Sequence, residues 1–405
     1  MKLQDDPPLH LTYCLNIHPG ETWEENFAAI REKTLAVKRL VAPDKAFGLG
    51  LRLSARAAQA LSQPKVMADF RAFLDANGLY VFTINGFPYG QFHEGVVKER
   101  VYRPDWTDDA RRDYTNTLAD ILAELLPEGV SGSISTLPLS YKKWFETSGI
   151  LEVSAEVLFR MQANVADCAW HLAEIRRRTG RQIVLAFEPE PDCLIESTDE
   201  AEQYLRAFLK EASGSIVFAR PCPLEVATDI IHRHVGVCVD ICHLAVEFEN
   251  PKTSLQRLAR AGIAVGKVQL SSALRFVPTR TARRRLREFS ESVYLHQVKV
   301  RKADRQVLSY RDLAEAPDVR GPEATPGEEW RIHFHVPLYV SEYGELKSTS
   351  NLYTPELAKL LTSGVTPHLE IETYTFDVLP AAAREPDVVR SIAREYEWVL
   401  DYLKC

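Results

Sequence analysis

The sequence predicts an α/β protein, a (β/α)8 TIM barrel with a long insertion after its seventh strand. Eight short apolar runs alternate with amphipathic helical patterns along the chain. This alternation predicts a parallel sheet whose outer face is covered by helices. No Gly-x-Gly-x-x-Gly motif follows the first run, which removes the main alternative, an open doubly wound dinucleotide-binding sheet.

The expected elements follow one another in a regular order. Ser197 and Glu200 form a capping box, Thr107 is the expected cap of the helix that follows it, and Gly78 and Gly180 lie where helices should end. The expected strands are 9–18, 46–54, 79–86, 129–137, 182–189, 234–242, 264–271 and 367–375. The expected helices are 21–42, 65–77, 107–126, 154–179, 198–212, 223–233, 251–261, 354–363 and 385–403.

The seventh unit contains a segment that the barrel does not need. Residues 273–353 separate the seventh strand from its helix and are rich in Arg, Glu and Pro. Long insertions on the strand-to-helix side of such barrels lie above the catalytic face. We expect a single domain over 1–405 in which 273–353 forms a lid or subdomain over a pocket. The alternative is a surface excursion that is unrelated to chemistry.

Composition narrows the class of protein. The chain has 405 residues, of which 45% are hydrophobic and 26% charged, and its formal charge is −7. This acidic balance argues against nucleic-acid binding. No apolar run approaches the roughly 18 residues of a membrane span, and the first 13 residues do not resemble a signal peptide. Seven cysteines without a Cys-x-x-Cys motif fit reduced thiols. We therefore expect a cytoplasmic protein.

Four side chains that can bind a metal end four successive strands. Glu188, Asp240, Gln269 and Glu372 each close one of the last four apolar runs. Alternation along a strand places them on the inner face, while the larger apolar side chains face the helices. Polar groups buried in this way are unfavourable unless they are paired or ligated. The pattern predicts one divalent ion, with Mn²⁺ or Mg²⁺ favoured by the oxygen donors and Co²⁺ or Zn²⁺ an option if a histidine joins.

Other polar residues are expected around this ion as substrate contacts. His243 follows Asp240 by three residues and would reach a ligand of the ion. Asn85 either binds a hydroxyl group or caps a buried turn, and His93 either reaches the pocket or stabilises its own loop. His333 and His335 alternate in one strand and point the same way, and His335 is the expected contact.

Two further residues lie two positions from a predicted ligand. Lys267 precedes Gln269 by two residues on the inner face, where it is either a buried partner for the carboxylates or a catalytic acid in contact with substrate. Glu190 follows Glu188 by two residues and is expected to contact substrate.

These motifs also carry a family resemblance that covers nearly the whole chain. An EP dipeptide, a DxxH motif, a Gln in VQLS and a Glu near the end occur in the order found in the xylose isomerase-like TIM-barrel superfamily. That superfamily includes sugar isomerases, tagatose-type epimerases, hydroxypyruvate isomerase and, more distantly, endonuclease IV. Within it, the chain resembles the EboE "metabolite traffic" family. The segments that carry this likeness are LTYCLNIHPGETW, NGFPYGQFHEGVVKERVYRPDW, LSYKKWF, FEPEPDC, CVDICHLAVEFE, VQLSSAL and LEIETYTFDVLP.

The resemblance implies roles for particular residues. Glu188, Asp240 and Glu372 would be metal ligands, and Gln269 stands where epimerases commonly have a histidine and hydroxypyruvate isomerase-like proteins have a glutamine. Isomerases of this superfamily often use the carboxylates after strands five and eight as an acid–base pair, which here are Glu188 and Glu372. The EboE association implies a role in maturing or moving a metabolite precursor, with other proteins of the same gene cluster as partners.

The sequence therefore predicts metal-assisted isomerisation or epimerisation of a hydroxylated, sugar- or cyclitol-like small molecule. Two alternatives belong to other classes. A phosphodiester hydrolase like endonuclease IV would have a basic groove and two or more bound ions. A non-catalytic protein that binds and hands over a metabolite would tolerate Glu372→Gln.

Overall fold

Eight parallel strands form a nearly closed barrel, which confirms the predicted fold class. The computed structural model describes residues 1–87, 98–289, 295–317, 326–374, 376, 379, 385 and 387–404. Hydrogen-bonded neighbours follow in the order β2, β17, β10, β9, β8, β5, β4 and β3, and a bridge between Cys14 and Gly50 joins the two ends. The strands are β2 (Leu9–Tyr13), β3 (Phe47–Arg52), β4 (Leu79–Asn85), β5 (Gly132–Thr136), β8 (Ile183–Phe187), β9 (Val235–Asp240), β10 (Val265–Leu270) and β17 (His368–Ile371).

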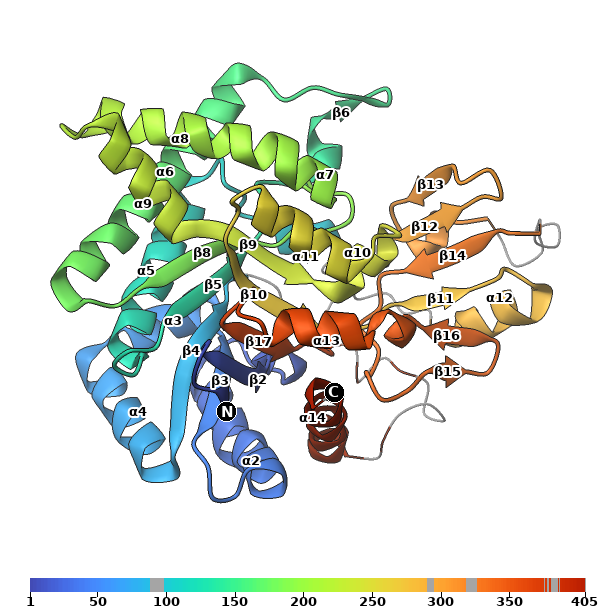
Figure 1. Cartoon of the computed structure of the whole chain (residues 1–405), viewed down its shortest axis with the longest axis horizontal. Coiled ribbons are helices and arrows are strands. Elements are labelled where there is room, and N and C mark those ends of the chain that lie inside the picture. Colours follow the sequence, from blue (N-terminus) through green and yellow to red (C-terminus); the bar gives the residue numbers. More distant parts are fainter. Residues whose placement is uncertain are drawn as a thin grey trace.

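Helices surround the barrel on its outside (Figure 1). The apolar faces of the strands, including Leu11, Leu185 and Leu369, are completely buried in one hydrophobic core with these helices. The longer helices are α4 (Pro64–Asn77), α5 (Asp109–Leu125), α6 (Ala155–Thr179), α8 (Arg206–Ala219), α9 (Leu224–His234), α11 (Pro251–Arg260) and α14 (Val388–Leu403). The shorter ones include α1 (Trp23–Ala29), α2 (Leu35–Val41), α3 (Ala55–Leu61), α7 (Thr198–Glu200), α10 (Ile241–Val246) and α13 (Pro355–Leu361).

Three of the four predicted helix boundaries are confirmed. Ser197 and Glu200 form a capping box, and Gly78 and Gly180 adopt the left-handed conformation at helix ends. The prediction for α5 was wrong by one residue. Asp108 is the N-cap, because its carboxylate accepts the backbone N–H of Ala110, while the hydroxyl and backbone N–H of Thr107 donate to Asp105.

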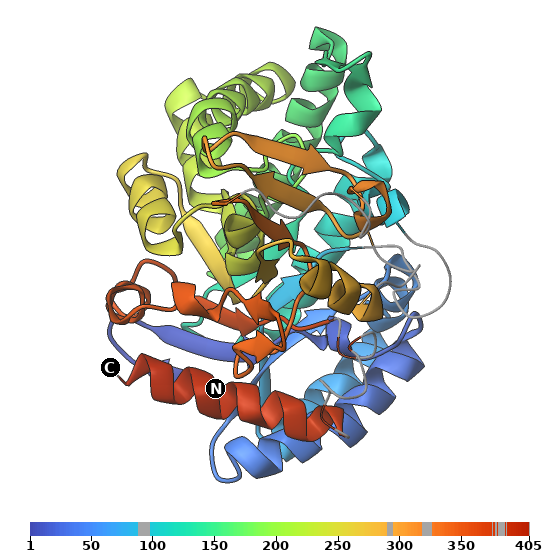
Figure 2. The same cartoon turned by 90° about the vertical axis from the view of Figure 1, so that its right-hand side faces the viewer.

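A second, antiparallel sheet is formed by the segment between β10 and α13. Its order is β13 (Val307–Tyr310), β12 (Val298–Arg301), β14 (Glu329–Ile332), β11 (Leu274–Phe276), β16 (Leu346–Ser348) and β15 (Glu342–Tyr343). The sheet and α12 (Arg280–Leu286) bury their own hydrophobic cluster, which includes Phe276, Trp330 and Leu346. In Figure 1 this sheet stands to one side of the barrel, and in Figure 2 it lies in front.

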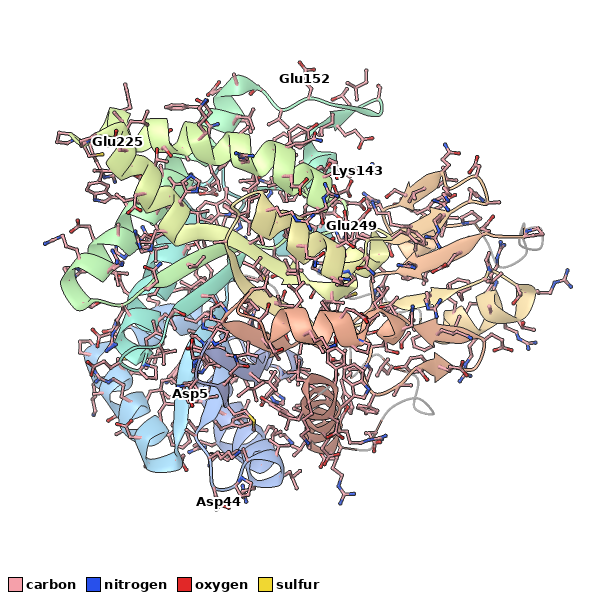
Figure 3. The ribbon with its side chains drawn as sticks, in the orientation of Figure 1. Asp5, Asp44, Lys143, Glu152, Glu225 and Glu249 are labelled. Atoms are coloured by element: carbon pink, nitrogen blue, oxygen red, sulfur yellow. The ribbon has the colours of Figure 1, made fainter. Side chains whose placement is uncertain are left out.

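Acidic side chains are exposed at several edges of the molecule. The side chains of Asp44, Glu152 and Glu225 are exposed and project from the edges of the molecule (Figure 3). Among the described residues, no helix has both the length and the apolar character that crossing a membrane requires.

Candidate active site at the carboxyl end of the barrel

Strand ends place three carboxylates in one cluster. Glu188 directly follows β8 and precedes Pro189, which favours an extended backbone, and its N–H donates to the Thr136 carbonyl at 2.9 Å. Asp240 ends β9 and caps α10. Glu372 directly follows β17. The carboxyl ends of barrel strands are where such folds place their active sites.

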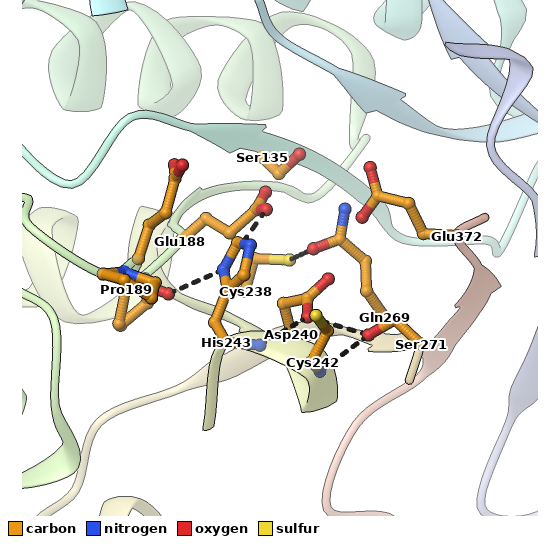
Figure 4. A network of polar contacts seen from close by, with 12 residues as sticks. Ser135, Glu188, Pro189, Cys238, Asp240, Cys242, His243, Gln269, Ser271 and Glu372 are labelled. Atoms are coloured by element: carbon orange, nitrogen blue, oxygen red, sulfur yellow. Dashed lines mark hydrogen bonds and ion pairs between the residues drawn. The ribbon is translucent and has the colours of Figure 1, made fainter. Parts of the chain in front are cut away.

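The three carboxylates are close together, buried and incompletely paired (Figure 4). One oxygen from each of Glu188, Asp240 and Glu372 lies within 4.8 Å of the others, and the residues are only 3%, 1% and 4% exposed. Oε2 of Glu188, Oδ2 of Asp240 and Oε2 of Glu372 have no hydrogen-bond partner among the described residues. Three buried anionic groups with orphaned oxygens repel one another. A divalent cation with oxygen ligands fits this donor set.

The second oxygens of two carboxylates are held by neighbours. Asn16 and Asn85 donate from Nδ2 to Oε1 of Glu372 at 2.7 and 3.3 Å. The Ser271 hydroxyl and the backbone N–H of His243 donate to Oδ1 of Asp240 at 2.7 and 2.9 Å. These contacts fix how the carboxylates are oriented. Asn85, a predicted substrate contact, therefore also orients Glu372.

Burial and mutual repulsion shift the acidities of the cluster. Burial, opposed by His243 and assisted by Asp240, raises the pKa of Glu188 to about 7. Burial and the charges of Glu188 and Asp240 raise the pKa of Glu372 well above its usual value. Burial also acts on Asp240, but the adjacent His243 and His335 outweigh it and lower the pKa of that carboxyl group. The cluster therefore combines Asp240, whose pKa is lowered, with two carboxyl groups whose pKa values are raised, of which Glu188 exchanges its proton near neutral pH.

Gln269, the fourth predicted ligand, lies beside the carboxylates, but its side-chain oxygen points toward Cys238 and not toward the carboxylate cluster. Its Oε1 accepts the Cys238 thiol at 3.0 Å, and its Nε2 has no partner among the described residues (Figure 4). Side-chain amides can be turned by 180° at little energetic expense when the partner is a thiol, which is both a weak donor and a weak acceptor. The turned amide would present its oxygen to the ion.

A pocket opens above the carboxylates. Its enclosed volume is about 80 Å³, and the space above it is open to solvent. The predicted contacts Asn85, Glu190, His243 and His335 all line it, whereas His93 lies outside the described residues. The lining residues are Asn16, Arg52, Asn85, Phe87, Lys98, Val101, Tyr102, Glu188, Glu190, His243, Leu295, His333, His335, Glu372 and Tyr374.

Lys267 is the predicted substrate contact that the structure keeps out of this pocket. Its Nζ atom donates to Oε2 of Glu370 at 2.6 Å and to the Ser135 hydroxyl at 3.1 Å, and Lys267 and Glu370 are both completely buried. A Cβ atom at Gly50 of β3 would lie 2.1 Å from Oε1 of Glu370 and 2.9 Å from the Tyr13 carbonyl oxygen, so a larger residue there would displace the Glu370 side chain or β2. This arrangement corresponds to the first of the two roles that the sequence left open, a buried partner for a carboxylate.

Three histidines lie above the carboxylates. His243, in α10, donates from Nδ1 to the Pro189 carbonyl at 2.9 Å, and His333 and His335 follow β14 of the second sheet. Burial lowers the pKa of His333 well below its usual value and that of His335 to about 4. The charges of Asp240 and other carboxylates outweigh burial at His243 and raise its pKa.

Sequence reasoning missed several pocket residues. Tyr102 donates its hydroxyl to Oε1 of Glu190 at 2.7 Å, and Arg52 is a buried cation at the end of β3 that pairs with Glu21 at 2.8 Å. Arg52 could have been found by the strand-end rule that identified the four predicted ligands. His333 was recognised only as facing the same way as its neighbour His335.

A solved structure has the same fold as this chain. A xylose isomerase-like TIM-barrel protein from Mycobacterium smegmatis, in complex with magnesium, is 16% identical, with a TM-score of 0.50 over 98% of this chain and 96% of that one. This chain has a xylose isomerase-like TIM-barrel fold. D-psicose 3-epimerase with D-tagatose, from Clostridium cellulolyticum H10, is 12% identical, with a TM-score of 0.46 over 98% of both chains. The IOLI protein with a bound zinc atom is 10% identical, with a TM-score of 0.46 over 98% of both.

At the level of sequence, the comparisons are negative. No protein-family model matches the chain, and no curated protein matches it. The likeness to known proteins is therefore one of fold.

Proposed function

We propose that this protein is a divalent-metal-dependent isomerase or epimerase that acts on a hydroxylated, sugar- or cyclitol-like small molecule. The observation that carries the proposal is the buried cluster of Glu188, Asp240 and Glu372, in which each carboxylate has one oxygen without a partner among the described residues. A site of this kind is stable only when a cation or protons balance its charge.

In this proposal, Glu188, Asp240 and Glu372 hold the ion, and Gln269 joins them when its amide is turned. A bound Mn²⁺ or Mg²⁺ would supply Lewis acidity toward a carbonyl or a pair of adjacent hydroxyl groups of the substrate. The magnesium complex of the Mycobacterium smegmatis protein is in keeping with a divalent ion in this fold.

The proton transfers are assigned to Glu188 and Glu372. Both carboxyl groups have a raised pKa, which suits a group that must take and return a proton near neutral pH. Asn85 and Asn16 hold Glu372 in place during that exchange. Around the substrate, Glu190, His243 and His335 are positioned along the pocket wall to donate or accept hydrogen bonds.

The resemblance to the EboE family supports a place for this reaction in the maturation or export of a metabolite precursor. In that setting, the substrate would come from another protein of the same gene cluster, and the product would pass to one.

Deuterium exchange tests the proposal whatever the product of the reaction is. Metal-free protein is loaded with MnCl2 and incubated in D2O with a panel of ketoses, aldoses and cyclitol ketones, and deuterium uptake is followed by mass spectrometry. We expect uptake at carbon for at least one compound. The Glu188→Gln variant should lower the rate at least about 100-fold, because general acid–base catalysis contributes this much.

Glu225→Gln is the matched control, since it makes the same change on the exposed face of α9 and should leave exchange intact. Protein that binds no added Mn²⁺ would overturn the proposal. Binding of a panel compound without deuterium uptake, together with tolerance of Glu372→Gln, would instead favour a metabolite-binding and handover protein.

A metal-dependent phosphodiester hydrolase is a second candidate, favoured by one observation. His243, His333 and His335 add nitrogen ligands beside the carboxylates, as a centre with several ions would require. Release of nitrophenol from bis(p-nitrophenyl) phosphate, lost in Glu188→Gln, would support this candidate over an isomerase.

A further inference from the structure

Three buried histidines form a chain of ring contacts in the pocket, with His333 in the middle. Nε2 of His333 lies 3.1 Å from Nε2 of His243 and also 3.1 Å from Nε2 of His335. None of the three residues is more than 4% exposed. They come from two separate parts of the fold, because His243 belongs to α10 of the barrel and the other two to the segment after β14.

The opposite ring nitrogens of two of these histidines are bonded to backbone carbonyl groups. Nδ1 of His243 lies 2.9 Å from the Pro189 carbonyl oxygen, and Nδ1 of His335 lies 3.0 Å from the Glu372 carbonyl oxygen. A carbonyl oxygen only accepts, so both Nδ1 atoms must carry the proton. In the neutral rings, Nε2 therefore presents a lone pair.

The third ring is fixed in the same way by an amide. Nδ1 of His333 lies 2.7 Å from Oε1 of Gln297. The orientation of that amide is determined, because its Nε2 donates to the Pro191 carbonyl at 3.1 Å and to the Tyr102 hydroxyl at 3.0 Å. Oε1 of Gln297 is thus an acceptor, Nδ1 of His333 is a donor, and its Nε2 also presents a lone pair.

Neutral rings in this arrangement repel one another, since lone pairs face each other across two contacts of 3.1 Å. One shared proton can bridge only one of the two contacts. A divalent ion can instead bind two of these nitrogens together with a neighbouring carboxylate oxygen. Two imidazole nitrogens at about 2.1 Å from a tetrahedral Zn²⁺ lie roughly 3.4 Å apart, which is close to the spacing seen here.

We propose that His243, His333 and His335 form a second metal site, which binds Zn²⁺ or a similar borderline ion beside the carboxylate site. Asp240 and Glu190 are the available oxygen ligands. One group within 4.8 Å combines Asp240 with His243 and His335, and another combines Glu190 with His243 and His333. The Nδ1 contacts to carbonyl and amide oxygens are the outer-shell partners that metal-bound histidines usually have.

The two sites adjoin at Asp240, which belongs both to the carboxylate cluster and to a histidine group. The second site rests on one part of the proposed function, the ion at the carboxylate cluster. It does not depend on the isomerase chemistry. Two adjacent ions would together bind two oxygens of one ligand, such as a vicinal diol, a hydroxy-ketone or a phosphoryl group. The carboxylate site would keep the harder ion and the histidine site the softer one.

X-ray absorption at the zinc edge tests the site in the unaltered protein. Metal-free protein is given one equivalent of ZnCl2 in the presence of MnCl2, dialysed, and measured for both metals. We expect about one zinc per chain, with the multiple scattering of about two imidazole rings in its first shell. A zinc spectrum that fits oxygen ligands without imidazole would overturn the proposal, and this result does not depend on any variant folding.

Variants then separate the two sites. We expect His333→Ala to lose zinc and keep manganese, whereas Glu188→Gln should lose manganese and keep zinc. His232→Ala, on the exposed face of α9, is the matched control and should keep both. Retention of zinc by His333→Ala would contradict the second site. Failure of the proposed function is distinguishable, because zinc would then bind normally while Glu188→Gln left manganese content unchanged.

Discussion

Two layers of the barrel interior differ in how their buried charges are balanced. In the lower layer, the Lys267 ammonium group meets the Glu370 carboxylate at 2.6 Å, so each buried charge has its counterpart within the chain. In the upper layer, Glu188, Asp240 and Glu372 gather three acids, and each keeps an oxygen that no described residue satisfies. The two layers are formed by the same strands, because Glu370 and Glu372 are two positions apart at the end of β17.

This difference in charge balance separates the buried polar groups that stabilise the fold from those that we expect to bind a ligand. In the lower layer the two buried charges balance each other within the chain, although Oε1 of Glu370 also lacks a hydrogen-bond partner among the described residues. A buried group of like charges is unfavourable unless its charge is balanced from outside the chain, in this case by a cation. Burial alone would not have separated the two layers, since both are almost fully inaccessible.

The largest expected effect comes from breaking the lower layer. Lys267→Met leaves the Glu370 carboxylate buried without its cation, which should lower the free energy of unfolding by about 3–5 kcal/mol. Urea denaturation followed by circular dichroism measures this change. The double variant Lys267→Met, Glu370→Gln should recover part of the loss. A single variant as stable as the parent protein would show that the lower layer does not depend on its ion pair.

The same kind of change in the upper layer should have the opposite consequence for the metal-free protein. Glu188→Gln removes one of three repelling acids, so metal-free stability should stay equal or rise, while Mn²⁺ affinity falls at least about 100-fold. Thermal unfolding with and without MnCl2, together with calorimetric titration, checks both parts. Loss of stability in the metal-free variant would contradict the contrast between the layers.

A smaller effect is expected from the residues that orient the upper layer. Asn85→Ala removes a donor to Oε1 of Glu372 and should weaken Mn²⁺ binding by about 10- to 30-fold, as for other outer-shell partners. Asn77→Ala, in α4, serves as the control, since it removes a similar side chain whose amide donates to the Phe73 carbonyl in its own helix. Equal affinities for the two variants would argue against an orienting role for Asn85.

The smallest expected effect is a dependence on pH that only the upper layer should show. Burial raises the pKa of Glu188 to about 7, so at pH 8 the carboxylate is ionised, whereas at pH 6 a proton competes with the metal. Mn²⁺ affinity should therefore fall by up to about tenfold from pH 8 to pH 6. Titrations at the two pH values test this. An affinity that rises on acidification would mean that Glu188 does not bind the ion.

The barrel could be predicted from the sequence because its signals are local. Each of the eight expected strands overlaps an observed one, since apolar runs and helix periodicity repeat along the chain. The rule that polar strand ends meet at one edge likewise brought Glu188, Asp240 and Glu372 together. Their roles as ligands and acids stay predictions until a metal is measured.

The rest of the site depends on how distant segments fold together, which local patterns do not report. His333 can take part in the site only because the fold brings it into contact with His243, which lies 90 positions earlier in the chain. Gln269 turns its oxygen toward Cys238 because that thiol lies on the adjacent strand. Thr107 was the expected cap, but its hydroxyl bonds to Asp105 in the preceding loop, and the N-cap is Asp108.

Two of the three histidines follow a strand of the second sheet, and the third belongs to a helix of the barrel. Changes to the second sheet can therefore alter the metal ligands separately from the barrel. His333 and His335 follow β14, outside the eight-stranded wall, while the carboxylates belong to the wall itself. The barrel holds a complete acidic cluster without them. Remodelling or exchanging the second sheet would therefore change the histidine ligands of the proposed centre while leaving the eight-stranded barrel and its carboxylates in place, so the ligand preference of the site could be altered by one local replacement.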